Sequence, residues 1–105
     1  MTIVYHVTPN YNLTSIRKHG LIPQLGPNAS ELGEKHPAIW LFPTKEDAET
    51  AVNSWLGDQF GYDTPASLLT IQIPEKLIKD SDVDYERICY QTIPAKYIKK
   101  IEQIW

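Results

Sequence analysis

Each of four short apolar runs in this sequence is closed by a proline. The runs cover residues 3–8, 38–42, 68–73 and 85–92, and β-branched and aromatic residues recur in them; the prolines are Pro9, Pro43, Pro74 and Pro94. Proline has no backbone N–H to give to a sheet, so it marks the end of a strand. The sequence therefore predicts four short strands.

A fifth apolar pattern runs from Ile98 to Trp105 and fits two structures. Ile98, Ile101 and Trp105 have helical spacing, whereas Ile101, Gln103 and Trp105 have the alternation of a strand. We expect a final strand here.

Two helices are predicted between these strands. Asn12 is placed to cap the first, Leu13 and Ile16 share its apolar side, and Gly20 is expected to end it in a left-handed conformation. The second begins at Thr44, which stands in a capping-box-like relation to Asp47, and ends at Gly57. Its apolar face comprises Ala48, Ala51, Val52, Trp55 and Leu56. Trp55 is the expected core anchor of this helix.

The remaining segments are polar connections. Residues 21–37 carry three prolines and two glycines, which predicts a long surface loop of the kind that often has a function. Residues 57–66 form a second loop, and residues 80–84 (DSDVD) a solvated turn. Helices early and consecutive strands late indicate an α+β domain, and 105 residues fit a single domain over 1–105.

Composition limits the function classes. A net charge of −3 argues against a general electrostatic grip on nucleic acid, although it leaves room for a nucleotide-sized ligand. The single cysteine, Cys89, excludes an internal disulfide and a cysteine-based zinc site, and no metal cluster is visible. No apolar run is long enough to cross a bilayer and no signal peptide is seen, so we expect a cytoplasmic protein with no membrane partner.

Few residues outside the predicted core carry chemistry. His6 lies on the first strand with Thr8 on the same face, and Glu86 shares a face with Ile88 near the start of a late strand. Each has an ordinary structural explanation: a hydrogen-bonded core histidine and an exposed strand end. His19, at the end of the first helix, suits the helix dipole. No phosphate-binding loop, dinucleotide fingerprint or zinc-protease motif is present.

Three ordered motifs resemble the ADP-ribosyltransferase-like superfamily. The first is Tyr5-His6-Val7-Thr8 with Leu13-Thr14-Ser15-Ile16 and His19-Gly20-Leu21-Ile22-Pro23; the second is Ile39-Trp40-Leu41-Phe42-Pro43-Thr44 before an alanine-containing helix. The third is Tyr85-Glu86, followed by Ile93-Pro94 and Tyr97-Ile98. The likeness spans almost the whole chain and is greatest to small bacterial and phage members, such as DNA-modifying transferases and the tRNA 2′-phosphotransferase group.

The resemblance implies a split β-sheet with two main helices and a cleft for NAD. Glu86 would be the catalytic carboxylate, and His6 would form a hydrogen bond with a ribose hydroxyl next to the nicotinamide. The other implied NAD-binding residues are Thr8, Tyr11, Trp40 and Phe42 around the nicotinamide, and Arg17 with the backbone at Gly20 or Gly26 at the pyrophosphate. The second motif lacks a clear Ser-Thr-Ser, and Arg17 and Arg87 are the only arginines, which argues against 2′-phosphate transfer.

Three functions remain open at this point. The first is an enzyme that transfers ADP-ribose from NAD to a protein or nucleic acid. The second is a catalytically inactive module that binds a nucleotide or a partner protein, such as an inhibitor or sequestering protein. The third is a small structural protein. The enzyme requires His6 and Glu86 to serve one cleft.

Overall fold

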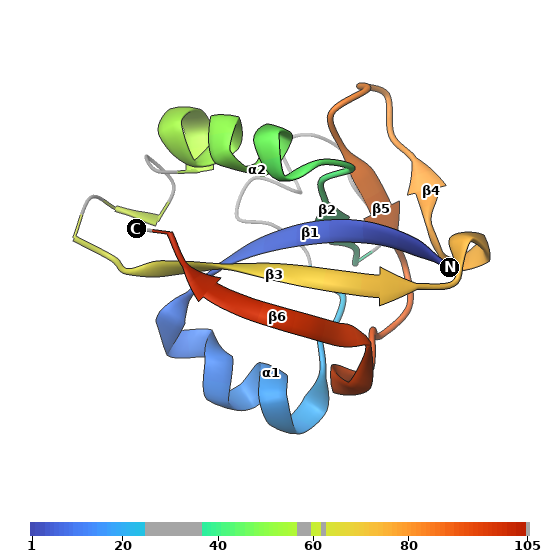
Figure 1. Ribbon diagram of the computed structural model, residues 1–105, viewed down its shortest axis with the longest axis horizontal. Helices are drawn as coiled ribbons and strands as arrows, with labels where there is room; N and C mark the ends of the chain where they lie inside the picture. Colours follow the sequence, from blue (N-terminus) through green and yellow to red (C-terminus); the bar gives the residue numbers. More distant parts are fainter. Residues whose placement is uncertain (25–36, 57–59, 62, 105) are drawn as a thin grey trace.

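The computed structural model describes residues 1–24, 37–56, 60–61 and 63–104. They form an α+β protein with two helices and two small antiparallel sheets, which confirms the predicted α+β class (Figure 1). The elements in chain order are β1 (Thr2–Pro9), α1 (Leu13–His19), β2 (Ile39–Leu41), α2 (Lys45–Ala51), β3 (Ala66–Ile73), β4 (Lys79–Asp80), β5 (Arg87–Cys89) and β6 (Ile98–Gln103). No helix in these described ranges is long and apolar enough to cross a membrane.

The first sheet has the order β1-β3-β6 and contains the longest strands. β1 pairs with β3 along its whole length, from Thr2 opposite Ile73 to Pro9 opposite Ala66. β6 pairs with the other edge of β3, which confirms the strand expected after Ile98. Trp105, at the end of that prediction, lies outside the described residues.

The second sheet has the order β2-β5-β4 and its strands are two or three residues long. The predicted strand at 85–92 is wrong in extent, because only Arg87–Cys89 is paired with β2. The chain turns before it, where the Glu86 N–H donates to the Val83 carbonyl at 3.4 Å. After it, Ile93 leaves the sheet and pairs with Leu21 through two hydrogen bonds of 2.9 Å.

One bridge joins the two sheets. The N–H groups of Tyr5 and Phe42 donate to each other's carbonyls at 2.9 and 2.7 Å, so β1 and the end of β2 are paired at that point. Beyond it the strands part. Among the described residues, the two sheets are therefore connected by an isolated bridge between β1 and the residue after β2.

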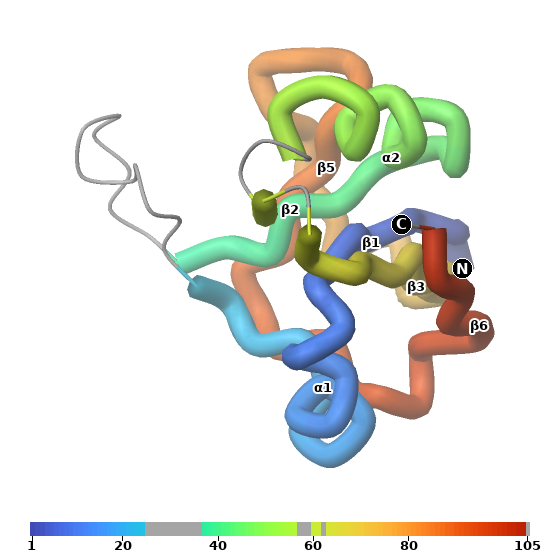
Figure 2. The backbone as a smooth tube through the Cα atoms, turned by 90° about the vertical axis from the view of Figure 1, so that its left-hand side faces the viewer, coloured from blue at the N-terminus to red at the C-terminus, as the bar shows by residue number. Residues whose placement is uncertain are grey.

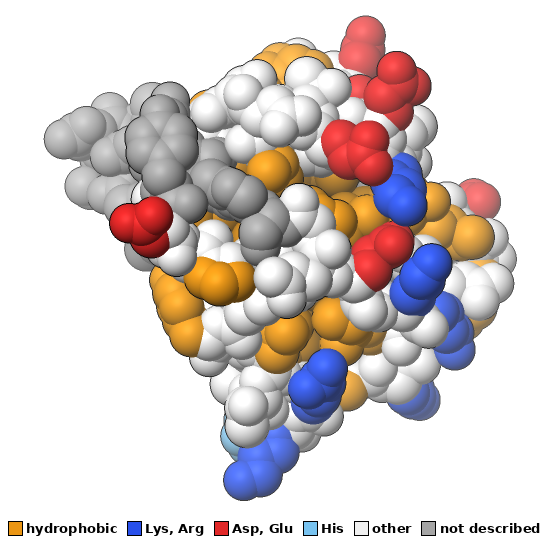
Figure 3. Space-filling model, turned by 60° about the vertical axis from the view of Figure 1, so that its left-hand side comes forward, with side chains coloured by type: hydrophobic (Ala, Val, Ile, Leu, Met, Phe, Trp, Pro, Cys, Tyr) orange, Lys and Arg blue, Asp and Glu red, His pale blue; other side chains and the backbone are white. Residues whose placement is uncertain are grey.

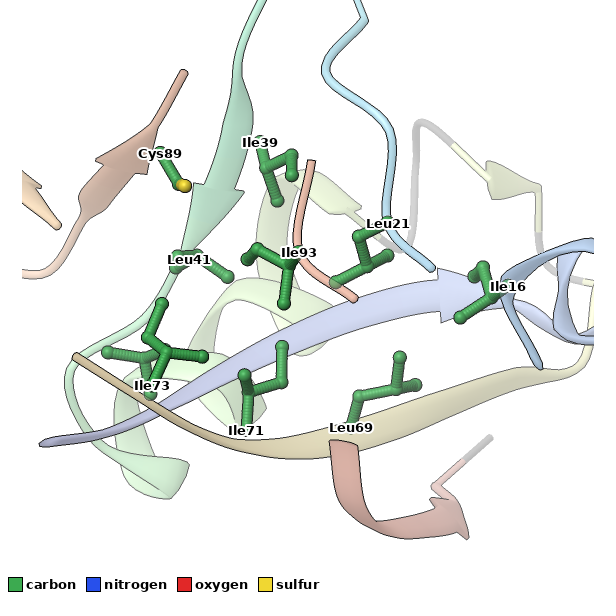
Figure 4. Packing of buried hydrophobic residues seen from close by; sticks show 10 residues of the cluster. Ile16, Leu21, Ile39, Leu41, Leu69, Ile71, Ile73, Cys89 and Ile93 are labelled. Atoms are coloured by element: carbon green, nitrogen blue, oxygen red, sulfur yellow. The ribbon is translucent and has the colours of Figure 1, made fainter. Parts of the chain in front are cut away.

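Two apolar clusters cover opposite faces of the first sheet. The larger lies toward α1 and the second sheet and is shown in Figure 4. Its buried members are Val4, Ile16, Leu21, Ile39, Leu41, Leu69, Ile71, Ile73, Cys89 and Ile93. The smaller lies toward α2 and comprises Val7, Phe42, Ala48, Ala51, Ala66 and Leu68. Leu68 and Leu69 belong to different clusters because successive strand residues point to opposite faces. Figure 2 shows α1 and α2 on either side of this sheet.

The first helix starts and ends where predicted, but it lacks the expected side-chain cap at its start. Gly20 has φ +76°, and its N–H donates to the Ile16 carbonyl at 2.8 Å. A Cβ at this position would collide with the Ile93 carbonyl oxygen, so only glycine fits. Asn12 precedes the helix, but its side chain makes no capping bond and instead donates to the Thr8 hydroxyl at 3.2 Å. Asn12 therefore occupies the predicted N-cap position, but the side-chain capping bond expected of it is not formed.

The second helix confirms its predicted start and corrects its predicted core. The Thr44 hydroxyl accepts the Asp47 N–H at 3.0 Å. The regular helix ends at Ala51, and a π-helical turn (Val52–Leu56) follows, with φ −123° and ψ −107° at Ser54. This irregular turn carries Trp55 outward, where it is 41% exposed. Ala48 and Ala51 are the fully buried residues of α2, so the prediction of Trp55 as core anchor is wrong. The predicted end at Gly57 lies outside the described residues.

Candidate functional site

A pocket of about 350 Å³ lies on the outer face of the second sheet. Its described lining is Trp40, Asp80, Ser81, Asp82, Val83, Glu86, Ile88 and Tyr90. Strand alternation explains the position of the pocket. Ile39, Leu41 and Cys89 are buried in the larger cluster, so Trp40 and its partner Ile88 project from the opposite face. The chain from β4 to the residue after β5 supplies the rest of the wall.

Glu86 is the carboxylate of the pocket that the sequence singled out. It immediately precedes β5 and is partly buried. Arg87 Nη1 donates to the Glu86 carbonyl at 2.7 Å and to the Asp84 carbonyl at 2.9 Å, which fixes the backbone at the entrance to β5. Glu86, Ile88 and Tyr90 line the same pocket, as expected for alternate residues of an extended segment. A partly buried carboxylate beside an indole ring is well placed to stabilise a cationic centre.

His6 lies where β1 and β2 part. Because a carbonyl can only accept, the imidazole Nδ1–H donates to the Trp40 carbonyl, at 2.8 Å. The bond satisfies the Trp40 carbonyl, which lies next to the Tyr5–Phe42 bridge between the sheets. Burial lowers the pKa of His6 below 6.5, and the bond to Trp40 opposes part of that shift. His6 is therefore neutral at pH 7, with Nε2 as an acceptor.

His6 and Glu86 both connect to Trp40, although from different directions. His6 holds the main chain of Trp40, whereas Glu86 lines the pocket together with the Trp40 side chain. His6 itself is not part of the described pocket lining, so His6 and Glu86 do not line one pocket as the transferase function requires. In this geometry His6 positions β2 and thereby the indole ring.

The other residues implied to bind NAD lie apart from this pocket. Thr8 is buried, and its hydroxyl donates to the Pro9 carbonyl and accepts from Asn12. Phe42 is buried in the smaller cluster, and Gly20 is packed against Ile93. Tyr11 is 77% exposed and Arg17 is exposed on α1. Gly26 lies outside the described residues, as does most of the predicted 21–37 loop.

Several pocket residues were missed from the sequence. Asp80, Ser81 and Asp82 belong to the segment interpreted as a solvated turn, and Asp80 instead lies in β4. Tyr90 lies four residues after Glu86, so strand alternation puts the two on one face, and this was the signal that could have identified it. Among the described residues, no group of histidine, cysteine and carboxylate side chains has the arrangement of a metal site.

No protein-family model matches the chain, and no curated protein matches it significantly.

Proposed function

We propose that this chain is an ADP-ribosyltransferase-like protein that uses NAD and transfers ADP-ribose to a macromolecular acceptor, a protein or a nucleic acid. The observation that carries the proposal is the pocket that Glu86 and Trp40 line together. These residues come from the second and third motifs of the resemblance, far apart in sequence. His6, from the first motif, bonds directly to Trp40.

The sheet arrangement supports the same proposal. The resemblance implies a split β-sheet, and here β1 and β2 are joined at Tyr5 and Phe42 and then diverge. The divergence occurs at His6, whose imidazole donates to the Trp40 carbonyl. A histidine with this bond is held as a single neutral tautomer, which leaves Nε2 able to accept a hydroxyl hydrogen such as that of a ribose.

ADP-ribose transfer requires a negative charge near the ribose and a surface that binds nicotinamide, and the side chains of the pocket can provide both. When the bond between nicotinamide and the ribose C1 breaks, nicotinamide leaves with the electron pair and positive charge develops on the sugar. The Glu86 carboxylate stabilises that charge, while Trp40 and Tyr90 offer ring faces to the nicotinamide. An acceptor nucleophile then forms a bond to the same carbon and releases its proton. A volume of about 350 Å³ admits the nicotinamide end of NAD.

The test is an NAD titration by calorimetry, with nicotinamide release measured in the same samples. We expect wild-type protein to bind NAD and release nicotinamide. Glu86→Gln should slow release by at least about 100-fold while retaining most NAD affinity, because its charge acts mainly in the transition state. Glu75→Gln is the matched control, since Glu75 is exposed and lies outside the described pocket lining. Equal release by wild type and Glu86→Gln would remove Glu86 from the mechanism.

One observation favours a second candidate, a catalytically inactive module that binds a nucleotide or a partner protein. Asp80 and Asp82 line the pocket together with Glu86, and these carboxylates repel an anionic pyrophosphate. NAD binding without nicotinamide release would support a nucleotide-binding module. The absence of NAD binding would reject the transferase and support a protein-binding module.

A further inference from the structure

Two aromatic rings lie against each other on the surface of the molecule. Trp55, from the π-helical turn after α2, and Tyr85, from the segment before β5, have ring centroids 5.5 Å apart at an interplanar angle of 51°. Each residue remains 41% exposed. Tyr85 is the sequence neighbour of Glu86, but neither ring belongs to the described pocket lining. Rings of this size are usually buried or in contact with a partner.

The segment that carries Tyr85 is strongly acidic. Asp80, Asp82, Asp84 and Glu86 alternate along it. Arg87 pairs with Asp80 at 3.4 Å and directs other donors to backbone carbonyls. Asp82 and Asp84 are exposed, and no cation in the described part of the chain pairs with either. The ring pair is therefore flanked by carboxylates that are accessible to a cationic ligand.

Residues 80–86 contain no basic side chain, although Lys79 and Arg87 flank them. Other exposed basic residues are Arg17 and Lys18 of α1 and Lys99 and Lys100 of β6. On the face shown in Figure 3, most carboxylates lie toward the upper right and most Lys and Arg toward the lower right and the bottom, and the two kinds are adjacent on the right. The carboxylates of residues 80–86 repel a phosphate backbone and attract a cationic segment.

We propose that Trp55, Tyr85, Asp82 and Asp84 form a docking surface for a basic peptide segment of another protein. The surface has two features, an exposed pair of rings and exposed carboxylates. A guanidinium or ammonium group can interact with both, because it can lie over a ring and face a carboxylate at the same time. Charge complementarity selects this partner over a nucleic acid. The docking surface depends on neither NAD binding nor turnover, so it is tested without NAD.

The experiment is fluorescence anisotropy with a labelled peptide of alternating Arg and Gly, and a Glu–Gly peptide of the same length as reference probe. We expect the Arg peptide to bind and the Glu peptide not to bind. Asp82→Asn/Asp84→Asn should weaken binding about tenfold, and Trp55→Ala about threefold or more. Glu46→Gln/Glu49→Gln is the matched control, because it removes the same charge from exposed positions of α2. Since all these side chains are exposed, circular dichroism should show intact folds.

Three results would overturn the proposal. Equal losses in the two double variants would show attraction to net charge alone. If a single-stranded RNA homopolymer bound more tightly than the Arg peptide, the partner of the protein would be a nucleic acid rather than a basic peptide. Self-association in sedimentation equilibrium that is abolished by Asp82→Asn/Asp84→Asn would assign this surface to a second copy of the chain.

Discussion

The two sheets differ in how their faces are covered. β3, at the centre of the first sheet, has buried residues on both faces, with Leu68 in the smaller cluster and Leu69 in the larger. The second sheet buries Ile39, Leu41 and Cys89 on one face, while Trp40 and Ile88 on the other line the pocket. The first sheet contributes buried residues to both apolar clusters, whereas the second sheet uses one face for the core and the other for a candidate site.

The largest expected effect tests this difference directly. Leu69→Ala removes a fully buried side chain from the first sheet and should cost about 2–5 kcal/mol in the free energy of unfolding. Ile88→Ala, on the half-buried face of the second sheet, should cost about 1 kcal/mol. Urea denaturation followed by circular dichroism measures both. Equal costs would mean that the two sheets contribute alike to the core.

The junction between α1 and the segment after β5 should be nearly as sensitive. Gly20→Ala forces a left-handed residue to carry a Cβ that collides with the Ile93 carbonyl, so we expect a cost of about 2–4 kcal/mol. The same denaturation measurement applies, with Gly61→Ala as control. Gly61 also has positive φ, but its nearest neighbour, the Thr64 hydroxyl, would lie 3.6 Å from the new Cβ. A loss no greater than that of Gly61→Ala would contradict the close packing at Gly20.

The hydrogen bond between His6 and the Trp40 carbonyl should make a smaller, pH-dependent contribution to the free energy of unfolding. Removing the imidazole in His6→Ala leaves the Trp40 carbonyl without its donor and should cost about 1–3 kcal/mol at pH 7.5. Because folding lowers the pKa of His6, the unfolded chain binds the proton more readily. The contribution of His6 is therefore complete above pH 6.5 and declines as the pH falls below it. Unfolding curves at several pH values should show the wild-type advantage shrinking on acidification; a constant advantage would contradict a buried neutral imidazole.

The smallest stability effect is expected at Trp55. Its ring is 41% exposed and packs against Tyr85, so Trp55→Ala should cost less than about 1 kcal/mol. Thermal unfolding of this variant beside Leu69→Ala would measure the contrast. A cost comparable to that of Leu69→Ala would place Trp55 in the core after all.

The elements of the first sheet were largely predictable, and the candidate site only in part. Strands β1 and β3 have enough apolar residues and clear enough proline boundaries to be recognised locally. The extent of β5 depends on the long-range pairing of Leu21 with Ile93, which local pattern does not contain. The position of Trp55 depends on the irregular backbone at Ser54. The pocket combines Trp40 with residues of the 80–90 segment, and that segment's aspartates had been interpreted as a solvated turn.

The pairing of β1 with β3 has a consequence for how the chain is made. Thr2 has Ile73 as its partner, and Ser67 has Gln103, so the first sheet cannot close until most of the sequence has left the ribosome. Contacts between such distant segments also slow folding, because a long loop must close before they gain any stability. During synthesis β1 remains unpaired until β3 has been made. Its apolar side chains are then exposed to chaperones and to other unfolded chains.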